Sequence, residues 1–326
     1  MSTDANISAQ EENAEESQSR FRILVPLDGS ELAAKALPLA EAICQQLPAE
    51  LHLVSVLSYL VLPYVGSETY ISGEVYQQLE EEREREARRY LGQTALTLRE
   101  HGITVRTHLG RGEAASRILD LSKDLRMSLI VMTTHGRTGL ARFALGSVAD
   151  RVVRGGAAPV LLLRSFSSEP QERDASPADL SYTLIPLDGS LQSEAPLFTI
   201  VPVLAGPVLH TITLFRVSDP RDGADGERLC ENYLTATRQR LVDSLQGREC
   251  AINTLVLGGR DPAARIVSCA REGTYNLVLM ATHGEAGIGR WTLGGVADRV
   301  LRDGDTPLLL VHPSRESGEK SQPSHT

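Results

Sequence analysis

Aromatic residues, positive charge and long apolar runs are all scarce in this sequence, and each shortage excludes a class of protein. Aromatic side chains make up 4% of the chain, too few for the stacking surface that holds single-stranded nucleic acid. The formal net charge is -9, whereas proteins that bind nucleic acid or acidic membranes non-specifically are usually basic. No run of about 18 apolar residues, the length that spans a bilayer, occurs. We therefore expect neither nucleic acid nor a membrane as a partner.

Cysteines are also few, and their spacing is not that of a metal site. Cys44, Cys230, Cys250 and Cys269 form no CxxC pair and no cluster with histidine of the zinc-binding type. We expect free thiols in a reducing cytoplasm and no dedicated metal site. Residues 1–20 are polar and acidic without the apolar centre of a signal peptide, so a disordered tail is expected there.

The chain contains an internal repeat. The segment PLDGS at 26–30 recurs at 186–190, 160 positions later, and LGSVADRVVR at 145–154 recurs as LGGVADRVLR, 148 positions later. The difference between these spacings makes the second copy 12 residues shorter, with the loss between the first and fourth strands. Two copies of one domain account for the length. The predicted organisation is a domain at 21–164, a polar, proline-containing linker at 165–180, a domain at 181–312 and a disordered tail at 313–326.

Short apolar segments alternate with amphipathic ones in each copy. This alternation predicts an α/β fold, with a parallel sheet and helices on both faces. Five strands per copy predict two tandem doubly wound domains of the flavodoxin-like or Rossmann-like type. In the first copy the predicted strands are 22–27, 51–57, 103–109, 128–133 and 159–164, and the predicted helices lie near 31–46, 73–100, 112–124 and 146–155.

Polar and glycine residues follow two of the predicted strands. Asp28 ends the first strand and residues 133–136 end the fourth, and ligands of doubly wound sheets bind at such carboxyl ends. Gly146 and Ser147 open the next helix, whose first amides lack intrahelical partners and attract phosphate. Ser147 adds a hydroxyl donor, and an ionised Asp28 would accept from an adenine amine or a ribose hydroxyl.

A second interpretation of the same residues stays open at this point. The sequence Asp-Gly-Ser after a strand also forms a turn and a helix cap, and a glycine before a helix often serves loop geometry alone. The chain has neither the GxxxxGK[ST] loop nor the GxGxxG fingerprint of the common nucleotide-binding folds.

The combination of motifs resembles one known family. VPLDGS at 25–30, THG at 134–136, GSVADRVV at 146–153 and APVLLL at 158–163 together resemble universal stress protein domains. The resemblance covers about 20–164 and 181–312, so the chain looks like a tandem member of the family. It implies a cytoplasmic stress-response protein in which a glycine loop of the form G-x2-G-x9-G-[ST] holds the phosphates of ATP, and Mg2+ accompanies ATP through those phosphates without a protein cage.

The resemblance also implies the residues of the site. In the second copy the corresponding residues form a weaker site: Asp188, Gly284, Gly294 and Gly295. In the first copy the implied nucleotide contacts are Pro26, Asp28, Thr133, His135, Gly136, Arg137, Gly146, Ser147 and Val148.

Both copies depart from the family pattern at its first glycine. Thr133 and Ala281 stand there. The second copy also has Gly295 in place of the hydroxyl residue, and Glu285 where the first copy has Arg137. A strained left-handed Thr133 would cost about 1–2 kcal/mol, against about 8 kcal/mol for micromolar binding. A side chain that fills the nucleotide's space would instead end binding. We therefore predict binding mainly in the first copy.

Three functions remain open: a nucleotide-binding sensor, a scaffold that acts through protein contacts, and a slow ATPase. No nucleophile–base pair supports catalysis, and we expect His135 and His283 to be structural loop residues. Asp150 and Asp298 are expected to be helix-surface charges. The last strand of each copy is apolar and lies at a predicted sheet edge, which needs covering. In the family such strands pair domains, so the copies are expected to pair within the chain, and a homodimer is a further possibility.

Overall fold

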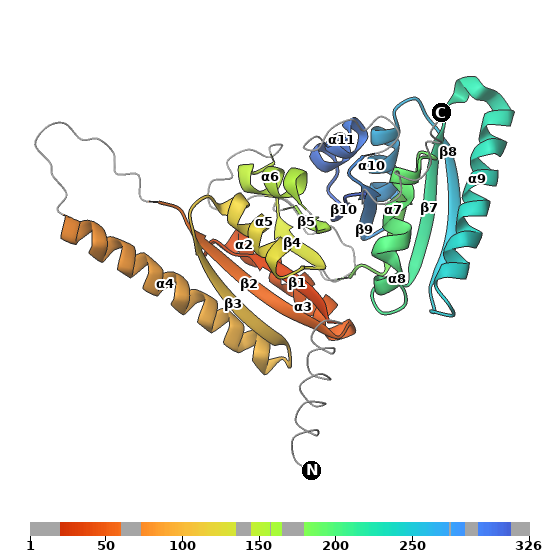
Figure 1. Cartoon of the computed structure of the whole chain (residues 1–326). Coiled ribbons are helices and arrows are strands. Elements are labelled where there is room, and N and C mark those ends of the chain that lie inside the picture. Colours follow the sequence, from red (N-terminus) through yellow and green to blue (C-terminus); the bar gives the residue numbers. More distant parts are fainter. Residues whose placement is uncertain are drawn as a thin grey trace, which may run out of the picture.

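The computed structural model describes residues 20–59, 73–134, 145–156, 158–164, 179–273, 275–283 and 293–313. The expected tails and most of the expected linker lie outside these residues. Within them, ten strands form one continuous sheet in the order β3-β2-β1-β4-β5-β10-β9-β6-β7-β8 (Figure 1). The strands are β1 Phe21–Pro26, β2 Ala49–Leu57, β3 Thr104–Arg111, β4 Leu129–Thr133, β5 Val160–Leu163, β6 Tyr182–Pro186, β7 Thr211–Ser218, β8 Ala251–Gly258, β9 Leu277–Ala281 and β10 Leu308–Val311.

Helices cover both faces of this sheet in each domain (Figure 1). In the first domain, α3 and α4 pack on one face, and α5 and α6 pack on the other. The helices are α2 Glu31–Ala34, α3 Leu37–Gln46, α4 Gly73–Glu100, α5 Ala114–Asp124, α6 Ser147–Gly155, α7 Leu191–Thr199, α8 Val201–Leu204, η1 Pro220–Asp222, α9 Gly223–Ser244, α10 Pro262–Glu272 and α11 Gly295–Asp303.

The strand order confirms the predicted doubly wound α/β fold. Each half contributes five strands that pair in parallel, in the order 3-2-1-4-5 of the Rossmann fold. The chain moves outward from β1 to β3 and then returns to the other side of β1 at β4. The order therefore reverses between β1 and β4, and equally between β6 and β9. Those two points are where the fold predicts a ligand.

Alternation along the strands separates two apolar cores. Ile23 and Val25 face the α3 and α4 side, whereas Leu24 between them faces α5 and α6. All three side chains are fully buried. Each core runs through both domains, so the two halves share their apolar interior on either face of the sheet.

The last strands of the two domains pair with each other, as expected. β5 and β10 are antiparallel, with Leu308 opposite Leu162 and Leu309 opposite Leu161. Each strand covers the apolar edge that the other would expose. The pairing makes the chain an internal pseudo-dimer.

The predicted helix at 31–46 is wrong as a single helix, because it is broken. α2 ends at Ala34 and α3 begins at Leu37. Pro38, in the first turn of α3, lacks an amide hydrogen and its ring would clash with the carbonyl of Ala34 in a continuous helix. The helix predicted from residue 112 begins only at Ala114, because Gly112 has a φ of 119° and Glu113 is the N-cap.

Candidate functional site

The turn after β1 uses Asp28 in the way that the cap interpretation predicts. Oδ1 of Asp28 accepts the backbone amide of Ser30 at 2.9 Å and its hydroxyl at 2.6 Å. Oγ of Ser30 accepts the amide of Ala33 at 3.1 Å and so caps α2. Gly29 has a φ of 81°, which favours glycine at the centre of the turn. Asp28 also lines a cavity, so the turn fixes the carboxylate at the wall of that cavity.

The α6 helix begins with open backbone donors. Its first helical hydrogen bond runs from the amide of Asp150 to the carbonyl of Gly146, at 2.9 Å. The amides of Ser147, Val148 and Ala149 therefore have no acceptor within the helix. The helix also has no side-chain cap in the described part of the chain. The amide of Gly146 is not one of these donors, because it is bonded to the carbonyl of Thr134 at 2.8 Å.

Thr133 is the last residue of β4 and carries no backbone strain. It pairs with Leu163, and the next amide, that of Thr134, donates to the carbonyl of Leu163 at 2.9 Å. Arg126 and Gln246 are the non-glycine residues with positive φ in the described ranges. The left-handed strain considered for Thr133 is therefore absent. Its side chain is buried in the cavity wall, so any effect on a ligand comes from the side chain.

These residues surround a cavity of about 450 Å³ at the point where the strand order reverses. The volume lies within the range of small-molecule sites. His135, Gly136 and Arg137 lie outside the described residues. Of the other predicted contacts, all line the cavity. The lining residues are Pro26, Leu27, Asp28, Ala33, Val54, Val56, Ser58, Gly112, Glu113, Ala114, Ile118, Met132, Thr133, Thr134, Gly146, Ser147, Val148 and Ala149.

Part of this wall comes from β2 and α5, and the sequence does not mark those residues as belonging to a site. Val54, Val56 and Ile118 are ordinary core residues in the sequence, and no polar motif marks them. Only the strand order could have indicated them, because the carboxyl end of β2 lies at the same edge of the sheet as the carboxyl ends of β1 and β4. Glu113 was equally unmarked, although an acidic residue before a helix is a recognisable cap.

Glu113 ties α5 to α6 beside the cavity. Its carboxylate accepts the amides of Ala115 at 3.2 Å and Ser116 at 2.8 Å, and Arg151 of α6 lies 3.0 Å away. Burial raises the pKa of Glu113, but the hydrogen bonds from Ser116 and Ala115 and the charge of Arg151 together lower it below its usual value. The ionised carboxylate thus caps α5 and pairs with Arg151 of α6 beside the cavity.

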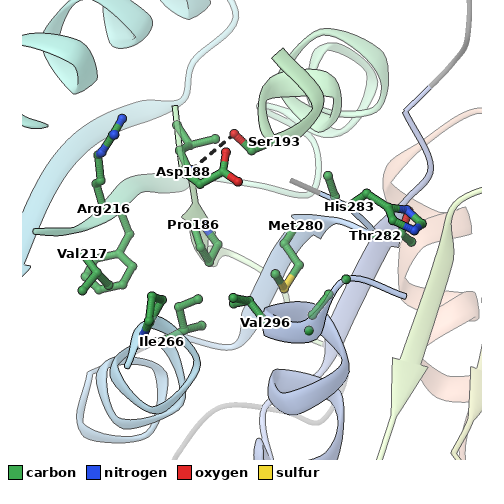
Figure 2. A pocket seen from close by; sticks show the side chains of 17 residues that line it. Pro186, Asp188, Ser193, Arg216, Val217, Ile266, Met280, Thr282, His283 and Val296 are labelled. Carbon is green, nitrogen blue, oxygen red and sulfur yellow. Dashed lines mark hydrogen bonds between the residues drawn. The ribbon is translucent and has the colours of Figure 1, made fainter. Parts of the chain in front are cut away.

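The second domain repeats this arrangement around a cavity of about 300 Å³ (Figure 2). Oδ1 of Asp188 accepts the amide and hydroxyl of Ser190, at 2.9 and 2.6 Å. The amide of Gly294 is bonded to the carbonyl of Thr282 at 2.8 Å, and α11 has no side-chain cap in the part of the chain that is described. Asp188, Gly294 and Gly295 all line the cavity, whereas Gly284 lies outside the described residues.

His283 also lines this cavity and lies to the right of Asp188 in Figure 2. Its Nδ1 is 3.1 Å from Oγ1 of Thr282, and Nδ1 of His312 is 3.2 Å from the same oxygen. This hydroxyl contact suits the structural role expected for His283. His135, its counterpart, lies outside the described residues.

Asp150 and Asp298 have a role beyond the surface charges expected of them. Each pairs at 2.8 Å with the arginine one turn later, Arg154 and Arg302 respectively. Arg154 also lies 3.4 Å from Asp298 of the other domain. The four residues form an ion-pair group between α6 and α11.

In the described residues, no group of three or more histidine, cysteine, aspartate or glutamate side chains is placed to hold a metal ion. No helix in the same residues is long and apolar enough to cross a membrane.

Comparisons with known proteins agree over nearly the whole chain. The model of the universal stress protein family matches residues 20–164 and again 183–312. A universal stress protein of Methanocaldococcus jannaschii is 33% identical over 45% of this chain and 84% of its own length. One from Mycolicibacterium smegmatis is 24% identical over 91% of this chain and 99% of its own.

Solved structures support the fold. The crystal structure of a universal stress protein from Archaeoglobus fulgidus superimposes with a TM-score of 0.67 at 18% identity. The match covers 90% of this chain and 98% of that one. At this identity the likeness concerns the fold alone, and it extends over both domains.

Proposed function

The chain belongs to the universal stress protein family, and we propose that its first domain binds an adenine nucleotide, ATP with its Mg2+, and that the protein acts as a nucleotide-responsive regulator in a stress response. The observation that carries the proposal is the composition of the 450 Å³ cavity. Its wall combines the start of α6, which has no side-chain cap in the described residues, with the apolar side chains of Val54, Val56 and Ile118. A nucleotide has the same division into an anionic and a flat, largely apolar part.

The anionic part fits the start of α6. The open amides of Ser147 and Val148 and the hydroxyl of Ser147 point to phosphate oxygens as acceptors, and the partial positive charge of a helix start favours them. Asp28 would accept from the adenine amine or the ribose. Mg2+ would be held by the phosphates and water, since Mg2+ commonly keeps several of its waters.

The experiment measures nucleotide binding on the whole chain and identifies the site by matched variants. We expect ATP titrated calorimetrically into the nucleotide-free protein to bind with a stoichiometry near one per chain. Gly146→Leu should abolish this binding without loss of folding, while Gly294→Leu at the corresponding cap of α11 should leave it unchanged. A stoichiometry near two would contradict the asymmetry. No binding at millimolar ATP would refute the site.

The alternative is a scaffold that no longer binds nucleotide. It is favoured by the side chain of Thr133, which lies in the cavity wall where the family pattern has glycine. Thr133→Gly distinguishes the two. If the wild-type chain binds no nucleotide and this variant does, the scaffold interpretation is supported. Slow ATP hydrolysis would appear as metal-dependent phosphate release, and loss of that release in His135→Ala would identify an ATPase.

A further inference from the structure

The two cavities can be compared position by position, because the strand register is the same in both domains. Val54 of β2 pairs with Pro26, and Phe215 of β7 pairs with Pro186. Pro26 and Pro186 are the same position of the repeated PLDGS motif. Phe215 in the second domain therefore stands where the first domain has Val54. Each of the two residues lines its cavity.

Four such positions on β2 and at the start of α5 form the apolar wall of the cavity. In the first domain they are Val54, Val56, Ala114 and Ile118. Because the first amides of α6 are the anion-binding donors, this apolar wall is left for the base of a nucleotide.

In the second domain the same four positions hold Phe215, Val217, Pro262 and Ile266. Val217 and Ile266 are the same residue types as Val56 and Ile118, their counterparts in the first domain. Phe215 and Pro262 are both larger than the residues they replace. The cavity is about 300 Å³ here, compared with about 450 Å³ in the first domain. The second cavity is therefore the smaller one, as expected when two larger side chains line its wall.

Phe215 cannot turn aside to admit a ligand. Its side chain is fully buried, and it belongs to the same core cluster as Ile266 and Met280. Protein cores are packed as densely as organic crystals, so moving a buried ring requires its neighbours to move as well. The ring is therefore a fixed part of the wall.

We infer that Phe215, together with Pro262, excludes a purine base from the second domain, and that Val54 is the residue that admits a base to the first. This inference rests on the proposed nucleotide site. It assigns the difference between the domains to the base-binding end rather than to the missing hydroxyl at Gly295. Losing one hydrogen bond weakens binding roughly tenfold, whereas losing the burial of an aromatic ring weakens it on the order of a hundredfold.

The first arm of the test places the larger residue in the first domain. Val54→Phe should weaken ATP binding by on the order of a hundredfold, by the loss of base burial. Val54→Ile, which adds one methylene at the same position, is the matched control and should stay within about threefold of the wild type. Thermal unfolding of both variants identifies any loss of folding. Unchanged affinity in a folded Val54→Phe variant would overturn the inference.

The second arm opens the second domain while the first is closed. In the Val54→Phe background we compare Gly295→Ser alone with Gly295→Ser combined with Phe215→Val and Pro262→Ala. Among the described residues, no atom lies within 4 Å of a Cβ added at Gly295, so serine is accommodated by them. The combined variant should regain ATP binding, with one site per chain, and Gly295→Ser alone should not.

The outcomes separate this inference from the proposed function. If Gly295→Ser alone restores binding, or if the folded combined variant binds no better than its background, Phe215 is not the determinant. If the wild-type chain binds no adenine nucleotide, the proposed function fails first. Binding by the wild type together with either contrary result refutes only the role of Phe215.

Discussion

His312, which follows the last strand of the second domain, donates from Nε2 to the backbone carbonyl of Val153 in the first domain, at 2.5 Å. Arg164, which follows the last strand of the first domain, donates to the carbonyls of Leu301 and Arg302 in the second. The carbonyls belong to the ends of α6 and α11, where intrahelical donors run out. Each domain thus stabilises the helix whose opposite end lines the other domain's cavity.

Removing Arg164 should measurably destabilise the chain. Its guanidinium bonds two carbonyls at a helix end, and hydrogen bonds from charged groups contribute about 1.5–3 kcal/mol. We expect Arg164→Ala to lower the free energy of unfolding by about this amount in urea titrations. Arg88→Ala, which removes an exposed pair with Glu84 on α4, should cost about 0.5 kcal/mol or less. Equal effects of the two changes would show that the contact between domains adds no stability.

The ion pair between Arg154 and Asp298 should contribute much less. Both side chains are partly exposed, at 28% and 26%, so water screens the attraction. Arg154→Ala is expected to cost about 1 kcal/mol or less, and about 1 M salt should remove most of the difference. Unfolding measured at low and high salt tests this. A larger cost that salt does not change would mean that the group is desolvated.

Stability should fall as the pH falls through the histidine range. Burial lowers the pKa of His52, His108 and His312, and it is the largest cause in each case. The unfolded chain then binds more protons near its histidine pKa of about 6.5, so the free energy of unfolding decreases as pH falls from about 8 to 5.5. Carboxylates whose pKa is lowered in the folded chain, such as Glu113, also lose their contribution to stability as the pH falls, but only at pH values below the histidine range.

The second domain provides a matched variant for this pH effect. By register, Thr213 and Leu255 occupy the positions of His52 and His108. His52→Thr with His108→Leu should therefore flatten the dependence of melting temperature on pH between about 8 and 5.5. A steep slope that persists in the double variant would assign the effect to other groups.

The repeated sequence was sufficient to predict the fold but not the base-binding end of the site. Repeated motifs such as PLDGS and VADRV, together with apolar periodicity, predicted the doubly wound domains and an apolar edge strand that needs covering. The pairing of β5 with β10 was implied by the resemblance to the family. These features are local in sequence. The position of Val54 against Ala114 depends instead on how β2 and α5 pack, and nothing in either segment marks it. Pro38 lies within the helix predicted at 31–46, and a proline at that position is itself a sequence signal for the break between α2 and α3.

The motif at the anionic end was placed correctly in the chain, but the role of each atom was not predictable. Gly146 was expected to sit at a helix start and does so, yet its amide is already bonded to Thr134. Thr133 was considered a possible source of strain, but it is an extended strand residue. Both outcomes depend on the hydrogen bonds that join β4 to its surroundings, which composition and spacing do not specify.

A charged side chain between β5 and β10 should show whether this strand pairing only stabilises the fold or also prevents association through the sheet edges. Leu309 is 1% exposed and pairs with Leu161, so Leu309→Asp buries an unpaired carboxylate and opens two apolar edges. The cost should exceed about 3 kcal/mol, and the uncovered edges should recruit other chains, which light scattering detects as larger species. Leu96→Asp on the exposed side of α4, at 58% exposure, is the matched control and should change neither property. If Leu309→Asp unfolds more easily yet keeps the oligomeric state of the wild type, each domain conceals its own edge, and β5–β10 pairing stabilises the chain without protecting it from association.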